Sequence, residues 1–212
     1  MLNPKYGNIS RATVDRLPLY FRTLRLIKSE GSDIVSSEEL GRRIGVTPEQ
    51  IRKDLAGFGA FGKKGVGYHV AELLSNIGVI LGIDRRWNIC IVGIGHLGWA
   101  LANYRNFASM GFHLSALFDQ NPALVGQVIN GVEVMTVADM EITIADRNIQ
   151  IGVITVPASE AQNVADRMVA AGVHGIWNFA PVRIRVPETV QLVSEDLSVG
   201  LTTLSFHLRQ RL

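Results

Sequence analysis

The chain has 212 residues, of which 47% are hydrophobic and 19% charged, enough for one large domain or two small ones with an ordinary core. The single cysteine, Cys90, excludes a disulfide framework and suits a reducing cytoplasm. No apolar run is long enough to span a bilayer, and residues 1–11 lack the apolar segment of a signal peptide. We therefore expect a cytoplasmic protein with no membrane partner.

Charge is divided unevenly along the chain. Residues 1–86 hold 14 Lys and Arg against 9 Asp and Glu, whereas residues 87–212 hold 7 against 10. The lysines all fall in the first part, although the net charge of the whole chain is only +2. A basic first part beside a mildly acidic second part favours a polyanionic partner for the first.

The first part is predicted to be helical. Residues 13–29 carry apolar side chains at helical spacing and predict a first helix. A second helix follows Ser36, an N-cap with acidic residues behind it, and a third covers residues 49–56 after Thr47 and Pro48. Two short helices joined by a glycine-containing turn are typical of a helix-turn-helix, whose second helix enters the major groove of DNA. The alternative is a small helical subdomain whose charges are only solvated.

A glycine-rich stretch follows at residues 57–70, where glycines alternate with aromatic residues around Lys63 and Lys64. It predicts a hairpin with a basic tip, the wing of a winged helix, in which the lysines add salt-dependent affinity for phosphates. The rival interpretation, a nucleotide phosphate loop, lacks the order GxxxxGKS or GxxxxGKT. A helix over residues 70–81 then closes a winged-helix domain at residues 1–85. Its candidate DNA contacts are Arg16, Gln50, Arg52, Lys53, Lys63 and Lys64.

The second part opens on a strand, a glycine turn and a helix. An apolar strand at residues 89–92 runs into the pattern Gly93-x-Gly95-x-x-Gly98, and a helix is predicted over residues 97–107. The first glycine allows a tight turn, the second lets the backbone approach a pyrophosphate, and the third lets the helix pack closely on the strand. The N–H groups at the start of that helix attract phosphate.

The next strand, residues 112–118, ends at Asp119, about 20 residues past the last glycine of the pattern. An acid at this position suits the ribose hydroxyls of NAD and repels the additional phosphate of NADP. Residues 120–123 carry no Arg or Lys that could hold that phosphate. The alternative is a glycine turn that binds nothing, with Asp119 as an ordinary acid at the end of a strand.

The rest of the second part alternates strands and helices. Strands are predicted at residues 132–134, 150–157 and 175–181, with residues 182–186 following, and helices at residues 138–144 and 159–171. This pattern predicts a doubly wound parallel sheet of the Rossmann type over residues 86–193, with ligand at the carboxyl ends of its strands. The candidate cofactor-binding residues are Gly93, Ile94, Gly95, His96, Leu97, Gly98, Asp119, Thr155, Val156, Pro157, Asn178, Ala180 and Pro181.

The last segment, residues 194–212, predicts a helix that is apolar on more than one face. One stripe holds four leucines, and Val199 and Phe206 lie on a different face. Such a helix requires burial on more than one side. It either inserts into a partner subunit or covers the sheet of its own chain, and the pattern does not choose between the two.

Taken whole, the chain resembles the redox-sensing transcriptional repressors of the Rex family. The matching stretches cover residues 36–41, 51–55, 65–68, 90–101, 155–157 and 178–181. The resemblance implies a winged helix that binds operator DNA, a Rossmann domain that binds NADH or NAD+, and a homodimer closed by a swapped carboxy-terminal helix. It further implies that NADH releases the protein from DNA.

The resemblance also implies a switch, in which an acid at Asp196 pairs with Arg22 and Tyr104. The residues themselves equally allow Asp196 to be only the N-cap of the last helix.

The residues provide little for catalysis. Only about 19 residues follow the predicted sheet, too few for a substrate domain, and the histidines form no metal-ligand spacing and no nucleophile pair. These histidines are His69, His96, His113, His174 and His207. We expect a sensor that is not an enzyme and holds no metal. The alternatives are a small NAD-dependent oxidoreductase with an accessory domain and a CoA- or nucleotide-binding subunit of a ligase, against which Asp119 argues.

Overall fold

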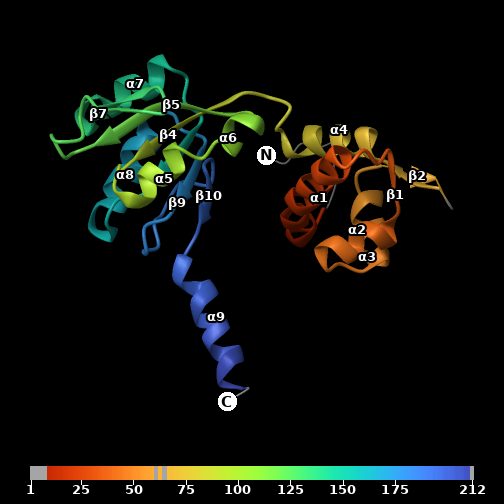
Figure 1. Cartoon of the computed structure of the whole chain (residues 1–212). Helices are drawn as coiled ribbons and strands as arrows, with labels where there is room; N and C mark the ends of the chain where they lie inside the picture. Colours follow the sequence, from red (N-terminus) through yellow and green to blue (C-terminus); the bar gives the residue numbers. More distant parts are fainter. Residues whose placement is uncertain (1–8, 60–61, 64–65, 211–212) are drawn as a thin grey trace. The chain divides into compact units, whose positions relative to one another are not determined.

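The computed structural model describes residues 9–59, 62–63 and 66–210 and divides into two compact units, Met1–Asp84 and Arg85–Leu212 (Figure 1). Each unit has its own hydrophobic core. The division falls one residue from the boundary that the sequence predicts. No helix in the described part of the chain is both long and apolar enough to cross a membrane.

The first unit is a winged helix. Its elements are α1 (Arg11–Ser29), β1 (Ile34–Val35), α2 (Ser37–Ile44), α3 (Pro48–Ala56), β2 (Gly62–Lys63), β3 (Gly67–His69) and α4 (Val70–Leu81). The three short strands form a sheet in the order β1-β3-β2, antiparallel throughout. The predicted hairpin is therefore confirmed, although Lys64 at its tip lies outside the described residues.

Local capping explains where the helices of the first unit begin. The hydroxyl of Ser36 accepts a hydrogen bond from the N–H of Glu39, and that of Thr47 accepts one from the N–H of Gln50. These bonds satisfy N–H groups that a helix start leaves unpaired. The helices then bury their apolar faces in one core, which includes Leu17, Tyr20, Leu24, Leu40, Ile51, Leu55, Leu73 and Ile77.

The second unit is a seven-stranded sheet of the Rossmann type. Its strands are β4 (Trp87–Val92), β5 (Phe112–Asp119), β6 (Val128–Ile129), β7 (Val132–Thr136), β8 (Ile151–Ile154), β9 (Gly175–Asn178) and β10 (Gln191–Ser194). Their order is β10-β9-β8-β4-β5-β7-β6, parallel except for the β6–β7 hairpin. The predicted doubly wound parallel sheet is confirmed.

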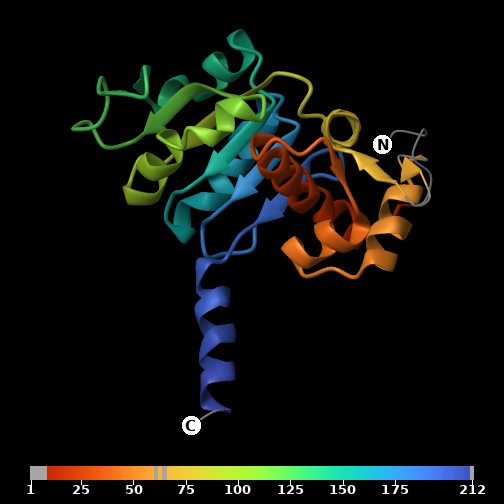
Figure 2. The ribbon, with the colours of Figure 1, turned by 45° about the vertical axis from the view of Figure 1, so that its right-hand side comes forward.

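Helices cover both faces of this sheet (Figure 2). They are α5 (His96–Ala102), α6 (Asn106–Ser109), the 3-10 turn η2 (Val137–Asp139), α7 (Met140–Asp146) and α8 (Ala158–Ala170). The terminal helix α9 (Leu197–Arg209) extends away from the sheet. Met140 and Met168, from α7 and α8, belong to the core on one face, while Ala102 from α5 belongs to the core on the other. Two cores of this kind bury both faces of the strands, as continuous apolar strands require.

One sequence-based prediction about this unit is wrong. The helix predicted over residues 97–107 ends at Ala102 and a separate turn, α6, follows. The side-chain amide of Asn103 donates to the carbonyl of Trp99 at 2.9 Å, and asparagine disfavours helix continuation because its side chain competes for backbone groups.

The last strand of the sheet is β10 at Gln191–Ser194, which agrees with the predicted end of the sheet near Val193, and residues 182–186 form no strand. The side chain of Gln162 on α8 bonds both backbone groups of Arg185, at 2.8 and 3.0 Å. This segment is thus held by a helix and not by the sheet, and Pro187 follows it without an N–H for a strand ladder.

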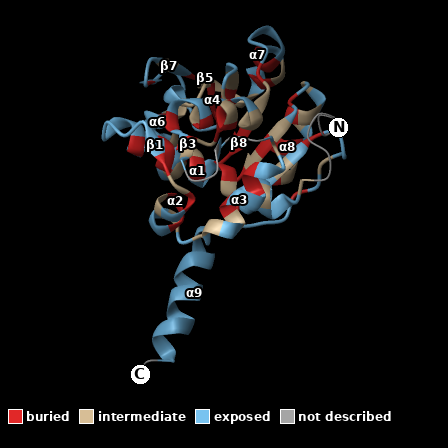
Figure 3. Ribbon diagram, turned by 90° about the vertical axis from the view of Figure 1, so that its right-hand side faces the viewer, coloured by how far each residue is buried: buried red, intermediate tan, exposed pale blue. Residues whose placement is uncertain are grey.

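The terminal helix α9 does not cover its own sheet. Every described residue of α9 is exposed (Figure 3). Six of its apolar side chains are each more than half exposed: Leu197, Val199, Leu201, Leu204, Phe206 and Leu208. The interpretation that α9 covers the sheet of its own chain is therefore wrong.

Candidate functional site

A cleft of about 940 Å³ opens at the carboxyl ends of the central strands of the second unit. The chain passes from β4 toward β5 and β7 on one side, and returns to β8, β9 and β10 on the other. The cleft lies at this reversal, between the ends of β4 and β8, where open α/β sheets bind their ligands. Its lining includes eight of the residues predicted from sequence: Gly93, Gly95, Leu97, Asp119, Thr155, Val156, Pro157 and Pro181.

The three glycines of the turn serve different purposes. Gly93 has φ of +94°, and a Cβ there would lie 2.8 Å from the carbonyl oxygen of Thr155. A Cβ at Gly98 would overlap the carbonyl oxygen of Gly93. Packing alone therefore requires glycine at these two positions. Gly95 differs, because a Cβ there would have no atom within 4 Å and the residue lines the cleft, so its missing side chain leaves room for a ligand.

Asp119 joins the end of β5 to the glycine turn. Its carboxylate accepts hydrogen bonds from the backbone N–H of Ile94 at 2.5 Å and of Asn121 at 2.8 Å. The residue is only 8% exposed but lines the cleft. Backbone N–H groups hold this carboxylate, so it keeps acceptor capacity for a ligand hydroxyl.

The cleft offers little attraction to the 2′-phosphate that distinguishes NADP from NAD. Among the described residues that line it, Arg167 is the one cationic side chain. Its guanidinium bonds the carboxylate of Glu141 at 2.5 and 2.8 Å and the carbonyl of Val137 at 2.8 Å. This pairing lowers the pKa of Glu141 and raises that of Arg167. A cation already paired with a carboxylate is a poor receptor for the 2′-phosphate of NADP.

At the end of β8, the hydroxyl of Thr155 lies 2.7 Å from the carbonyl of Gly93 and 3.0 Å from that of Val92. It thus ties the glycine turn to the neighbouring strand. Asn178 acts similarly at the end of β9, where its buried amide donates to the carbonyls of Ala180 and Val182 and accepts from the N–H of Ala180. These bonds fix the turn that brings Phe179 and Pro181 to the cleft.

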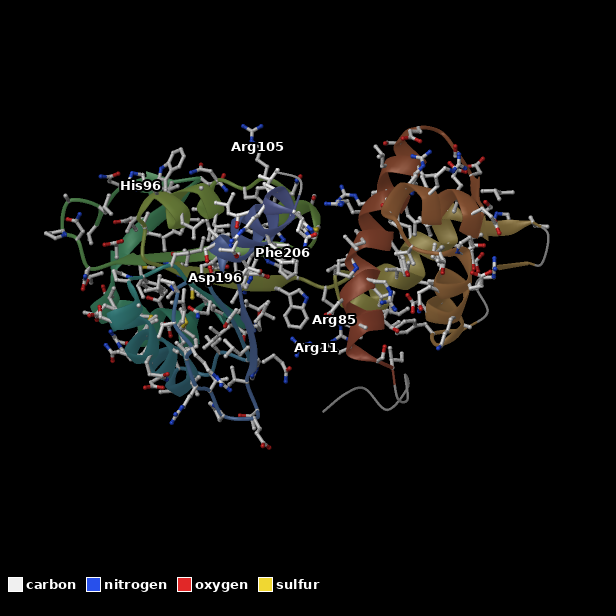
Figure 4. The ribbon with its side chains drawn as sticks, turned by 90° about the horizontal axis from the view of Figure 1, so that it is seen from below. Arg11, Arg85, His96, Arg105, Asp196 and Phe206 are labelled. Carbon is white, nitrogen blue, oxygen red and sulfur yellow. The ribbon has the colours of Figure 1, made fainter. Side chains whose placement is uncertain are left out.

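Five predicted cofactor residues do not line the cleft. Ile94, Gly98, Asn178 and Ala180 are buried behind it, while His96 is exposed at the start of α5 (Figure 4). They shape the cleft walls or flank them. The cleft is also lined by a polar row on α8 that was not predicted, formed by Glu160, Asn163 and Arg167. Their spacing places them on one helical face, directly after Pro157, and this pattern could have revealed them. Other missed lining residues are Val92, Gln120, Asn121, Leu124, Val137, Ala138, Val164 and Phe179.

In the first unit, α3 presents the candidate DNA contacts to different degrees. Lys53 is exposed and makes no ion pair in the described structure. Arg52 is half-exposed and binds Ser37 at 2.7 Å, Glu38 at 3.2 Å and Glu49 at 3.6 Å. The backbone of Lys63 belongs to β2.

The other two candidate contacts, Arg16 and Gln50, both bind the buried carboxylate of Asp54. The sequence analysis did not single out Asp54, because nothing local marks an acid that binds partners on another helix.

The three candidate switch residues lie far apart in the sequence: Arg22 on α1, Tyr104 in the loop between α5 and α6, and Asp196 just before α9. Asp196 caps α9, where its carboxylate accepts from the N–H of Ser198 at 2.8 Å and from its hydroxyl at 2.6 Å (Figure 4). These bonds lower the pKa of Asp196. Arg22 is exposed on α1, and Tyr104 is about half exposed with its ring packed on Phe107 at a centroid distance of 4.9 Å. The cap is therefore confirmed, while the pairing of the three residues stays a prediction.

Other reactive groups are accounted for. Cys90 is fully buried inside β4, and burial raises the pKa of its thiol to about 12, so it remains a protonated core residue. Within the described ranges, no group of three or more His, Cys, Asp or Glu side chains could hold a metal ion.

A winged helix joined to a Rossmann unit with a dinucleotide-type cleft defines the class of ligand-responsive DNA-binding regulators. Two family models match the chain: a putative DNA-binding protein N-terminus over residues 8–56 and a CoA binding domain over residues 84–182. The second describes the Rossmann unit alone.

Relatives that match over nearly the whole chain identify the family more specifically than the two family models do. Redox-sensing transcriptional repressors Rex from Syntrophobacter fumaroxidans and Clostridium beijerinckii are each 45% identical to this chain, over 96% and 97% of it and 98% of the relative. The crystal structure of RSP with β-NAD+ and operator DNA matches with a TM-score of 0.91 and 45% identity, covering 96% of this chain and 94% of RSP. RSP with β-NADH matches with a TM-score of 0.89 and 43% identity, covering 97% and 96%.

The chain belongs to the Rex family of redox-sensing transcriptional repressors. The resemblance drawn from its sequence is thereby confirmed. The alternative of a ligase subunit loses its support, because the Rex relatives match the winged helix as well as the Rossmann unit.

Proposed function

We propose that this chain binds operator DNA when NADH is scarce and leaves the DNA when NADH occupies the cleft of the second unit. The observation that carries the proposal is that one chain combines a basic winged helix with a glycine-turn cleft closed by Asp119. The RSP structures, one with NAD+ and operator DNA and the other with NADH, support the same pair of ligands here.

The cofactor we propose is NAD(H) and not NADP(H). The carboxylate of Asp119 would accept hydrogen bonds from the ribose hydroxyls, and the only cation on the described cleft lining is paired with Glu141. The N–H groups at the start of α5 would face the pyrophosphate. Bound in this way, the cofactor acts as an effector, and the protein performs no chemistry on it.

We propose that α9 joins two copies of the chain. Its exposed apolar side chains form a surface too large for a solvated helix, and such patches mark interaction sites. A second copy carries the same helix, so that exchange of α9 between two copies buries both. Introduction of a charge in the apolar middle of α9, as in Leu201→Asp, should give a monomer in light scattering. Thr203→Asp, a matched change at an exposed polar position of α9, should leave a dimer.

The whole proposal is tested by fluorescence anisotropy with a DNA duplex from the promoter of the gene that encodes this chain. We expect tight binding alone and with NAD+, and release with NADH but not with the same concentration of NADPH. Retention of the duplex at saturating NADH would overturn the proposal and favour the oxidoreductase alternative. The Gly95→Ala variant is the control, since it should bind DNA normally and no longer respond to NADH.

A further inference from the structure

One carboxylate in the first unit collects hydrogen bonds from two helices. Asp54 on α3 is 2% exposed. Arg16 bonds both of its oxygens, at 2.6 and 2.8 Å, and the hydroxyl of Tyr20 lies at 2.6 Å. The amide of Gln50 donates at 2.7 Å and the hydroxyl of Thr13 at 3.2 Å.

A buried carboxylate is stable only when it is paired and fully hydrogen-bonded. This one satisfies that requirement, because every partner is a donor. Burial alone would raise the pKa of Asp54, but the bonds from Arg16, Tyr20 and Gln50 outweigh burial and lower it to about 2. The carboxylate is therefore charged at neutral pH, and removal of any donor leaves part of that charge unpaired.

The donors on α1 lie on one face of that helix and therefore orient α3. Thr13, Arg16 and Tyr20 recur at intervals of three and four residues, so they lie on one face of α1. Asp54 lies immediately after Lys53 on α3, a helix of only nine residues. A helix this short has little stability of its own and takes its orientation from tertiary contacts. The cluster thus fixes the rotation of α3 about its axis, and with it the direction in which Lys53 projects.

We propose that Asp54 is the positioning residue of α3, the second helix of the helix-turn-helix. Arg16 and Gln50 then affect operator binding through Asp54 and not by touching DNA. This inference rests on the proposed function, in which α3 contacts the operator. It reassigns two side chains that their charge and polarity alone would place on DNA.

A double-mutant cycle distinguishes positioning from contact. Operator affinity is measured by anisotropy for Arg16→Met, Asp54→Asn and the double variant, across a series of salt concentrations. Each single variant should lose about 10-fold in affinity, the size of one lost base contact. The double variant should be no weaker than Asp54→Asn, because Arg16 then has nothing to act through.

The salt dependence gives the second readout. A residue that neutralises a phosphate contributes about 0.9 to the slope of log affinity against log salt. In the Asp54→Asn background, Arg16→Met should leave the slope unchanged, because it removes no phosphate contact of its own, whereas Lys53→Ala, the matched control, should lower the slope of the wild type by about one. Additive losses in the cycle together with a lower slope for the double variant than for Asp54→Asn would overturn the proposal and assign Arg16 to the DNA backbone.

Two measurements guard against loss of folding. NADH affinity belongs to the second unit and should stay at the wild-type value in every variant. Tyr20→Phe removes a single bond from the buried carboxylate while keeping the ring, and should weaken operator binding. Wild-type affinity in both Tyr20→Phe and Asp54→Asn would overturn the positioning role.

Hydrogen exchange of the α3 amides without DNA separates this proposal from the function on which it rests. Faster exchange in Asp54→Asn than in the wild type supports anchoring of α3, and equal exchange overturns it. If the wild-type chain does not distinguish its promoter duplex from an unrelated duplex of equal length, the proposed function fails, and the role of Asp54 in recognition fails with it.

Discussion

The carboxylate of Asp119 accepts a hydrogen bond from the backbone N–H of Ile94, across 2.5 Å, and so joins the end of β5 to the glycine turn. The same residue lines the cleft in which we place the dinucleotide. We therefore propose two tasks for Asp119, to hold the turn in shape and to accept a hydrogen bond from a ribose hydroxyl. Variants that separate charge from shape can tell them apart.

Asp119→Asn keeps the side-chain size and removes the charge. We expect weaker NADH binding and a smaller preference for NADH over NADPH, because the repulsion of a 2′-phosphate is lost. Calorimetry with both cofactors measures this. Asp146→Asn makes the same charge change at an exposed position outside the cleft lining and should alter neither affinity. Equal affinities for NADH and NADPH in the wild type would contradict the assignment.

Alanine at two glycines of the turn should affect different properties: stability at Gly98 and NADH affinity at Gly95. Gly98→Ala places a Cβ against the carbonyl of Gly93 and should destabilise the second unit by about 1–3 kcal/mol or more. Gly95→Ala meets no atom, so its melting temperature should match the wild type while its NADH affinity falls. A normal NADH affinity in Gly95→Ala would show that the backbone of Gly95 lies away from the pyrophosphate.

The wing is expected to hold the DNA backbone. Replacing Lys63 and Lys64 by alanine should lower the slope of log operator affinity against log salt by roughly one for each lysine. Lys28→Ala, at the exposed end of α1, is the control and should keep the wild-type slope. An unchanged affinity and slope in the double variant would remove the wing from the DNA interface.

Asp196 can be tested as a switch separately from its role as a cap. Asparagine also caps helices well, so Asp196→Asn should keep α9 and the dimer intact and remove only the charge. If the carboxylate pairs with Arg22 and Tyr104 in the NADH state, both Asp196→Asn and Asp196→Ala should bind operator normally and respond less to NADH. A coupling of this kind is typically about 1–3 kcal/mol. Release of Asp196→Asn at the wild-type NADH concentration would leave Asp196 as a cap alone.

The charge of Asp54 should make the first unit sensitive to acid. Its pKa falls from 3.8 to about 2 on folding, so its contribution is complete above about pH 4 and is lost as the pH falls through about 2. A shift of this size corresponds to about 2 kcal/mol. In urea unfolding followed by far-ultraviolet circular dichroism, the stability difference between wild type and Asp54→Asn should shrink over this range. A constant difference would show that folding does not lower the pKa of Asp54.

The sequence by itself determined the elements whose causes are local. Ser36 and Thr47 cap the helices that follow them because a hydroxyl reaches an N–H only a few residues away. The glycine pattern predicts the strand, turn and helix of the cleft because Gly93 makes the turn with a positive φ and Gly98 packs against the carbonyl of Gly93, five residues earlier. Parallel strands then bring Gly93, Asp119 and Thr155 together at one edge of the sheet, which alternation of strands and helices is enough to predict.

Only the tertiary structure decided what depends on residues far apart in the chain. Arg16 looks like a DNA contact in the sequence, but 38 positions later Asp54 takes its guanidinium. Gln162 captures the backbone of Arg185 and keeps that segment out of the sheet. The packing of whole helices decides which donor meets which acceptor. Without that packing, a side chain such as Arg16 is equally compatible with solvent, a ligand or a buried partner.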